Sequence, residues 1–296
     1  MLNRRHFLKS LGIGAMAGLI PKTSNSSSTA HESNPDAWGV LVDVSYCVGC
    51  RKCEWACHES NELGGAQMSD FENAINIDET RRPDSKNYTV VNGYEACTVG
   101  SRDCFVKVQC MHCLDPACVS ACIVGALEKN PEGPVSYDAD KCIGCRYCMV
   151  ACPFQIPAYE YDDALAPRVM KCTFCFEQNL KVGKRPACVE ICPEGALRFG
   201  KREDLIHYAH SRIEKHPDRY YPEVYGEHTV GGTSWLYIAG GSMVEHGLPD
   251  LPDQAPPRLT EVVQHGIFKN WVPPLALYAF LGGAMMVNRN GGGEDE

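Results

Sequence analysis

Four closely spaced cysteines at residues 142–152 constrain this chain more than any other feature. They follow the pattern C-x2-C-x2-C-x3-C, and Pro153 comes directly after the last of them. This pattern is typical of bacterial iron–sulfur proteins, in which three cysteines bind one [4Fe–4S] cluster and the fourth binds a neighbouring cluster. A fourth cysteine used in this way requires a second set of ligands elsewhere in the chain.

Three more sets of four cysteines supply such ligands, and the four sets are copies of one another in pairs. Sets one and three share the pattern C-[VI]-G-C-R-x-C-x-x-A-C, and sets two and four share P-A-C-V before, and G-A-L after, their last cysteine. In chain order, set one is Cys47, Cys50, Cys53 and Cys57; set two is Cys110, Cys113, Cys118 and Cys122; set three is Cys142, Cys145, Cys148 and Cys152; set four is Cys172, Cys175, Cys188 and Cys192. A duplication of this kind fixes the architecture.

The order of the sets predicts two nested modules. Sets two and three are adjacent, so residues 110–153 predict an inner two-cluster module of the bacterial ferredoxin type. Sets one and four flank it, so residues 38–60 and 170–200 predict an outer module of the same type. We therefore expect an α+β fold with small sheets and short helices, and one four-cluster domain over residues 31–260. The spacing of the last two cysteines in sets one and three predicts a short helix after each binding loop.

Exchange of the fourth cysteine within each module predicts four groups of ligands, so that all sixteen cysteines bind iron. The groups are Cys110, Cys113, Cys118 and Cys152; Cys142, Cys145, Cys148 and Cys122; Cys47, Cys50, Cys53 and Cys192; and Cys172, Cys175, Cys188 and Cys57. A [4Fe–4S] cluster with four thiolate ligands has no open coordination site. We therefore expect four clusters that transfer electrons one at a time, and no catalytic residue.

Disulfides and zinc are the two alternatives for so many cysteines. A disulfide framework is common in small exported proteins, but it gives no reason for four near-identical short spacings. Zinc usually takes two pairs of ligands, whereas C-x2-C-x2-C brings three thiolates into seven residues, which suits three corners of a cluster. We therefore prefer the iron–sulfur interpretation.

The rest of the sequence argues against other functions. The net charge is −9, and loss of the first thirty residues would remove four cations and no acid, leaving −13, so nucleic acid is not an expected partner. The chain has no P-loop and no G-x-G-x-x-G after a strand, so no ATP or nicotinamide site is predicted. Cys57 precedes His58, but the spacing differs from the C-x-x-C-H of a haem attachment site.

Residues 1–30 predict an export signal. Arg4 and Arg5 lie in a segment that resembles the twin-arginine signal, and residues 11–20 form an apolar stretch too short to span a bilayer. Small residues before and at Ala30 suit cleavage there. The twin-arginine route exports proteins already folded, as clusters inserted in the cytoplasm would require. A basic, disordered N-terminus is the alternative.

Residues 266–289 predict a C-terminal membrane anchor. Seventeen uncharged residues, 271–287, lie between Lys269 and Arg289. At ~1.5 Å per residue a helix of this length reaches ~25 Å, near the lower limit for crossing a bilayer. A hydrophobic tail buried against a partner protein is the alternative.

Between these features we expect a few further elements. Residues 38–43 predict a strand, residues 201–215 an amphipathic helix, and residues 225–239 a glycine loop followed by a strand. His228 in that loop is expected to be a surface or hydrogen-bonded histidine rather than a ligand. Residues 153–171 predict an extended connection. In the polar insertion at residues 58–109, Thr89–Tyr94 predicts a hairpin with Asn92-Gly93 at its turn. The two cysteines outside the sets, Cys97 and Cys104, are expected either to form a disulfide or to remain buried free thiols.

With its four sets in this order, the chain resembles the iron–sulfur electron-transfer subunits of membrane-bound respiratory oxidoreductases. This family includes the beta subunits of dimethyl sulfoxide reductase and formate dehydrogenase. Within it, the N-terminal signal and two segments, at residues 221–233 and 264–277, are similar to the ferredoxin-like subunit of quinone-linked nickel–iron hydrogenase. The likeness covers nearly the whole chain apart from residues 58–109.

This resemblance implies a relay on the periplasmic side of the cytoplasmic membrane. A catalytic oxidoreductase subunit would exchange electrons with this chain, and the chain would exchange them with an integral membrane, quinone-binding subunit. Nickel–iron hydrogenase is the expected catalytic partner, and a molybdopterin enzyme such as formate dehydrogenase or a sulfur-compound reductase is the alternative. An exported protein stapled by zinc or disulfides is the competing class, and iron and sulfide analysis separates the two.

Overall fold

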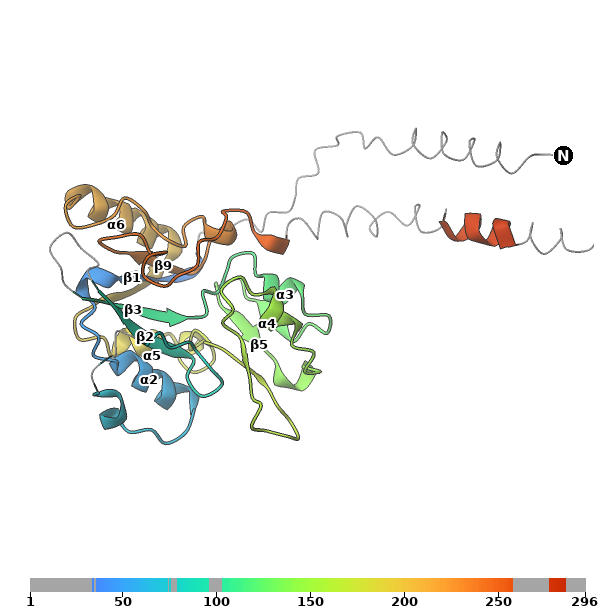
Figure 1. Ribbon diagram of the computed structural model, residues 1–296, viewed down its shortest axis with the longest axis horizontal. Coiled ribbons are helices and arrows are strands. Elements are labelled where there is room, and N and C mark those ends of the chain that lie inside the picture. Colours follow the sequence, from blue (N-terminus) through green and yellow to red (C-terminus); the bar gives the residue numbers. More distant parts are fainter. Residues whose placement is uncertain are drawn as a thin grey trace, which may run out of the picture. The chain divides into compact units, whose positions relative to one another are not determined.

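The structure is a computed structural model that describes residues 34, 36–73, 75, 79–95, 103–257 and 277–285 (Figure 1). The strands are β1 (Trp38–Asp43), β2 (Thr89–Tyr94), β3 (Cys104–Gln109), β4 (Leu127–Lys129), β5 (Val135–Tyr137), β6 (Ala158–Tyr159), β7 (Val169–Met170), β8 (Leu197–Lys201) and β9 (Trp235–Ile238). The α-helices are α2 (Lys52–Asn61), α3 (Ala117–Ser120), α4 (Tyr147–Ala151), α5 (Ala187–Glu190) and α6 (Arg202–Lys215). The 3₁₀ helices are η1 (Val44–Tyr46), η2 (Met68–Phe71), η3 (Ala139–Lys141), η4 (Leu180–Val182) and η5 (Thr229–Gly231). These small sheets and short helices confirm the α+β class.

The largest sheet joins the two ends of the outer module. Its strand order is β8-β1-β9, with β1 antiparallel to β8 and parallel to β9. The strand β1 leads into set one, whereas β8 follows set four, more than a hundred residues later. Strands distant in sequence are thus paired where the nested arrangement requires it.

A smaller hairpin repeats this pairing in the inner module. The strands β4 and β5 are antiparallel and lie between sets two and three. The Asp138 N–H donates to the Ala126 carbonyl at 2.8 Å, and the Asp43 N–H donates in the same way to the Ala196 carbonyl at 2.8 Å. The helices pair likewise, because α2 packs on α5 and α3 packs on α4. The two modules therefore have equivalent strand and helix pairs.

The insertion at residues 58–109 contributes a sheet to the core, and here the predicted hairpin is wrong. Residues 89–94 form one straight strand, β2, which pairs along its whole length with β3. Asn92 and Gly93 lie inside the strand opposite Val106 and Phe105. Asn92 is buried, and its side chain bonds to the backbone N–H and carbonyl of Arg81. These bonds hold Asn92 within the strand, in place of the turn that an Asn-Gly pair favours.

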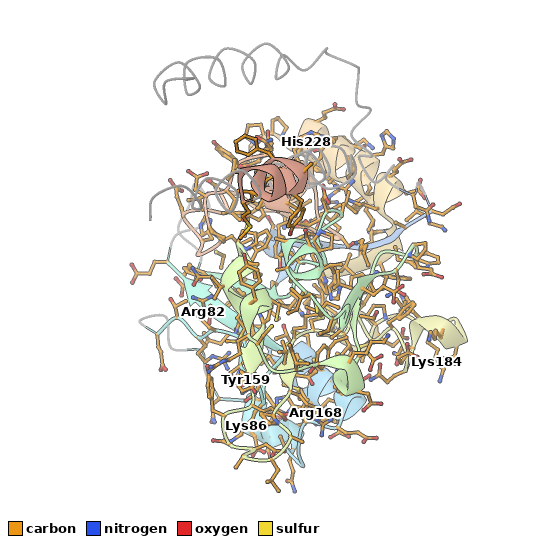
Figure 2. All side chains as sticks on the ribbon, turned by 90° about the vertical axis from the view of Figure 1, so that its right-hand side faces the viewer. Arg82, Lys86, Tyr159, Arg168, Lys184 and His228 are labelled. Carbon is orange, nitrogen blue, oxygen red and sulfur yellow. The ribbon has the colours of Figure 1, made fainter. Side chains whose placement is uncertain are left out.

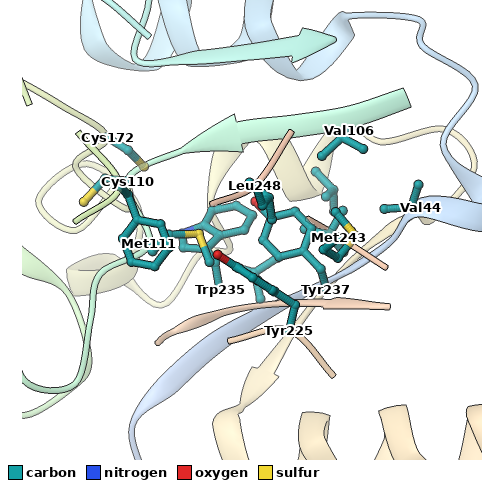
Figure 3. Close-up of a cluster of buried hydrophobic side chains, with 14 of the residues drawn as sticks. Val44, Val106, Cys110, Met111, Cys172, Tyr225, Trp235, Tyr237, Met243 and Leu248 are labelled. Carbon is teal, nitrogen blue, oxygen red and sulfur yellow. The ribbon is translucent and has the colours of Figure 1, made fainter. Parts of the chain in front are cut away.

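The core lies between the large sheet and the β2-β3 sheet. Trp235 and Tyr237 of β9 have no exposed surface, and they pack with Tyr225, Met243 and Leu248 (Figure 3). Several of the predicted iron ligands belong to this same cluster of buried side chains. The site is therefore built into the core rather than attached to it.

The helix α6 covers the other face of the large sheet. Leu205 and Ala209 pack against Leu41 of β1 and against Leu236 and Ile238 of β9. The helix begins one residue later than predicted and ends before His216, close to Pro217. The strand predictions for residues 38–43 and for the segment after the glycine loop are also confirmed.

The remaining expectations have mixed outcomes. His228, labelled in Figure 2, is exposed, with 74% of its side chain accessible. Its Nε2 lies 3.5 Å from Oε1 of Glu227. The connection at residues 153–171 is mostly irregular, but it contains the short β6-β7 pair. Cys104 is disulfide-bonded, which agrees with the first of the two expectations for it, and Cys97 lies outside the described residues.

The predicted signal at residues 1–30 and most of the predicted anchor at residues 266–289 lie outside the described residues. Residues 277–285 are helical. Within the described part of the chain, no helix is both long and apolar enough to cross a membrane.

Candidate metal centres

Sets one and three begin with the same backbone conformation. In both, an aspartate at the end of a strand accepts a hydrogen bond from the N–H two residues later and starts a 3₁₀ helix. The distance is 3.1 Å from the Ser45 nitrogen to Asp43 Oδ1, and 3.0 Å from the Asp140 nitrogen to Asp138 Oδ1. The first cysteine of each set follows as an extended residue. The duplication in sequence is thus also a duplication of local structure.

Residues with positive φ then turn the chain around the sulfurs. Gly49 and Gly144 have φ of 68° and 69°, a conformation that glycine adopts without steric cost. The Gly49 N–H donates a hydrogen bond to the sulfur of Cys47. Arg51 and Arg146 are also left-handed and start α2 and α4, so a helix follows each binding loop as predicted.

Gly49→Ala should disturb the first binding loop more than a change in backbone preference alone would. A Cβ at Gly49 would meet the Phe105 ring at 2.6 Å, whereas a Cβ at Gly125, where φ is 64°, would meet nothing within 4 Å. The left-handed conformation costs a residue with a Cβ about 1–2 kcal/mol, so Gly125→Ala should lose about that much stability. Gly49→Ala should lose about 1–3 kcal/mol more from overpacking. Urea unfolding of the two variants measures the difference, and equal losses would contradict the contact with Phe105.

Group I consists of Cys47, Cys50, Cys53 and Cys192, and these four residues line one cavity. The pKa of Cys47 is raised to about 11, mainly by burial and in part by the neighbouring thiolates of Cys192 and Cys50. Cys192 belongs to set four and the other three to set one. The structure therefore brings together thiols from the two ends of the outer module.

Group II consists of Cys57, Cys172, Cys175 and Cys188, all buried. Burial raises the pKa of Cys57 well above its usual value, and the three other thiolates of the group act in the same direction. Asn61 Nδ2 donates to the Cys57 sulfur at 3.6 Å. Cys57 is the fourth cysteine of set one, so this group completes the exchange in the outer module.

Group III consists of Cys110, Cys113, Cys118 and Cys152. Burial raises the pKa of Cys113 well above its usual value, and Cys110, Cys118 and Cys152 each add to the effect. Cys152 is the last cysteine of set three, whereas the other three belong to set two. The inner module thus places a cysteine of set three among those of set two.

Group IV consists of Cys122, Cys142, Cys145 and Cys148. The pKa of Cys148 is raised to about 11, mainly by burial and in part by the thiolates of Cys142, Cys145 and Cys122. The Ala126 N–H donates to the Cys122 sulfur at 3.1 Å. In each of the four groups that the sequence predicts, the four cysteines therefore lie near one another. That these groups bind iron remains a prediction.

Electrostatic interactions between thiols link the groups in the order I, II, III, IV. Cys188 raises the pKa of Cys53, Cys110 that of Cys172, and Cys148 that of Cys118. Figure 3 shows Cys110 and Cys172 at one edge of the buried cluster. Groups I and IV each contain one exposed cysteine, Cys50 and Cys145, whereas all of group II is buried. The two ends of the series are thus the groups that reach the surface.

The number and state of the thiols in each group suit a [4Fe–4S] cluster. All sixteen cysteines of the four groups are free. Within the described ranges, no three His, Cys, Asp or Glu side chains could hold a single metal ion. A zinc ion needs its ligands at about 2.3 Å from one centre, whereas a [4Fe–4S] cluster binds one thiolate at each of four separate irons. Each group has one free thiol for each iron of such a cluster, and a cluster bound there would supply one-electron transfer.

Buried lysines among the groups are functional candidates that no sequence motif indicates. Lys107 and Lys171 are buried, and Lys129 is largely covered. Burial lowers the pKa of Lys129 to about 8, against the opposing charges of Cys113 and Cys110. In the sequence, the position of Lys107 between two valines of a strand is the one feature that indicates its burial.

The sequence is similar to a family of iron–sulfur domains and to several known proteins. Residues 102–202 match the family described as "4Fe-4S dicluster domain". A protein of Nitratidesulfovibrio vulgaris (strain Hildenborough) is 47% identical over 242 residues, which cover 81% of this chain and 65% of that protein.

Two further relatives are similar to this chain over most of their own length. The hydrogenase-2 operon protein HybA of Escherichia coli O157:H7 is 34% identical over 98% of this chain and 96% of its own length. The nitrate-inducible formate dehydrogenase iron–sulfur subunit of Escherichia coli (strain K12) is 36% identical over 72% of each chain.

Proposed function

Because this chain belongs to the family of the hydrogenase-2 operon protein HybA and the formate dehydrogenase iron–sulfur subunits, we propose that it is a non-catalytic electron-transfer subunit with four [4Fe–4S] clusters. The observation that carries the proposal is the series of groups I–IV, each with four thiols from two sets. Four thiolates per cluster leave no iron free for a substrate.

The chain's own residues hold and shield the clusters in this proposal. Groups II and III lie mostly in the core, where water is excluded. Cys50 and Cys145 are exposed, so groups I and IV lie where other proteins can approach them. A closed interior with two accessible ends suits a relay between two partners.

We propose a nickel–iron hydrogenase catalytic subunit as one partner and a quinone-reactive integral membrane subunit as the other. The match to HybA extends over nearly the whole of both chains, whereas the match to the formate dehydrogenase subunit covers 72% of each. A molybdopterin enzyme such as formate dehydrogenase is the alternative. Purification of the native complex followed by metal analysis distinguishes the two, because the first requires nickel and the second molybdenum.

We also propose that the protein works on the periplasmic side of the cytoplasmic membrane. The twin-arginine pattern at residues 4–5 and the uncharged stretch at residues 271–287 support export and anchoring. Replacement of Arg4 and Arg5 by lysine should hold the protein in the cytoplasm, as cell fractionation would detect. Normal export of that variant would contradict the proposed signal.

Iron and acid-labile sulfide analysis tests the number of clusters. Four [4Fe–4S] clusters require about sixteen iron atoms and as many sulfides per chain in protein purified without oxygen. Near-zero iron would eliminate the electron-transfer proposal and favour a structural protein. About eight irons would restrict the clusters to one module.

A further inference from the structure

Lys107 is a buried cation without a carboxylate partner among the described residues. It lies on β3 and is 2% exposed. Its Nζ donates to Gln109 Oε1 at 2.9 Å and lies 4.6 Å from the centroid of the Trp235 ring. A buried ammonium with only neutral partners is strongly unfavourable, so we expect a negative charge beside it.

Lys107 lies between groups I and II. It lines the same cavity as the four cysteines of group I. On the side of group II, burial raises the pKa values of Cys57, Cys172 and Cys188, and the positive charge of Lys107 opposes that rise in each. As thiolates, Cys53 of group I and Cys172 and Cys188 of group II would place negative charge near this ammonium.

A hydrogen-bonded ring fixes the lysine in this position. Gln109 Nε2 donates to the Tyr237 hydroxyl at 2.6 Å, and that hydroxyl donates to the Lys107 carbonyl at 2.8 Å. Gln109 Oε1 accepts from the ammonium. Tyr237 belongs to β9 and is fully buried. The ammonium is thus held in place by two strands rather than by a flexible side chain alone.

We propose that Lys107 is the counter-charge of the clusters in groups I and II and raises the reduction potential of both. The inference rests on the proposed function, because it requires clusters in these groups. A reduced cluster carries one more negative charge than the oxidised one, so a fixed cation nearby stabilises the reduced state. The low dielectric of the core strengthens this effect. Lys107 acts through the clusters and is a positioning residue, not a ligand.

The test is a redox titration of the whole protein, followed by low-temperature EPR. At the potential where each affected cluster is half reduced in the wild type, Lys107→Met should raise the ratio of oxidised to reduced cluster about tenfold in two of the four clusters, which corresponds to 59 mV for one electron. Lys107→Arg keeps the charge and should change the ratio far less. Lys129→Met is the matched control, because Lys129 faces thiols of group III, so a different cluster should shift.

Three outcomes would overturn the inference: unchanged potentials in Lys107→Met, an equal shift in all four clusters, or an equal shift in the Met and Arg variants. If Lys107→Met does not assemble all its iron, Gln109→Glu replaces it, because a carboxylate bonded to the ammonium cancels its charge. The same two potentials should then fall, and their constancy would refute the role of Lys107. A wild-type protein without iron would refute the proposed function itself, which keeps the two failures distinct.

Discussion

Cys122→Ser should abolish the cluster of group IV and leave the cluster of group III in place. Cys122 lies in set two, four residues after Cys118, but its sulfur is a neighbour of Cys148 in set three. Loss of one thiolate ligand removes one corner of the site. The iron content should fall from about sixteen to about twelve atoms per chain, and the EPR signal of one cluster should disappear.

Cys118→Ser is the matched control for this exchange. Both cysteines lie in or next to α3, so a general disturbance of that helix would affect both variants alike. Cys118 is grouped with Cys110, Cys113 and Cys152, and its replacement should remove the cluster of group III instead. Adding Cys142→Ser to Cys122→Ser should then cost no further iron. Additional iron loss in that double variant would contradict the exchanged grouping.

The cysteine pattern predicted which thiols lie near one another, because short segments with the same sequence fold in the same way. In set one, local features such as the aspartate before Cys47 and the glycine after it determine the loop. The same features recur before and after Cys142. A local rule that is repeated in sequence is repeated in structure, so both loops and their helices could be foreseen.

Elements that depend on distant contacts were less predictable. Asn92 has the sequence signal of a turn, but its amide bonds to the Arg81 backbone and the strand continues. The parallel pairing of β9 with β1 has no local signal, because it joins residues almost two hundred positions apart. Lys107 was also overlooked, since a lysine in a strand is usually exposed. Its burial follows from tertiary packing against Trp235.

The iron-free protein should become less stable as the pH rises above about 9. The usual thiol pKa is 9.0, and burial raises it to about 11 in Cys47 and to about 12 in Cys118 and Cys172. Folding therefore favours the neutral thiols. This contribution is fully present below pH 9, where unfolded and folded chains both hold the proton, and it is lost as the pH rises towards 11–12. A shift from 9.0 to about 12 corresponds to at most about 4 kcal/mol for a single thiol.

The iron-loaded protein should show the opposite dependence, because iron binds thiolates and releases their protons. Acid then competes with iron for sulfur, so clusters should be lost as the pH falls, while moderate alkali leaves them bound.

Urea unfolding of the iron-free protein between pH 7 and 10.5 measures the first effect, and visible absorbance against pH measures the second. Tyrosines and lysines also titrate in alkali, so an iron-free variant with Cys118 and Cys172 replaced by alanine is the control. Its stability should fall less steeply with pH, and an equal slope would show that the buried thiols are not the cause.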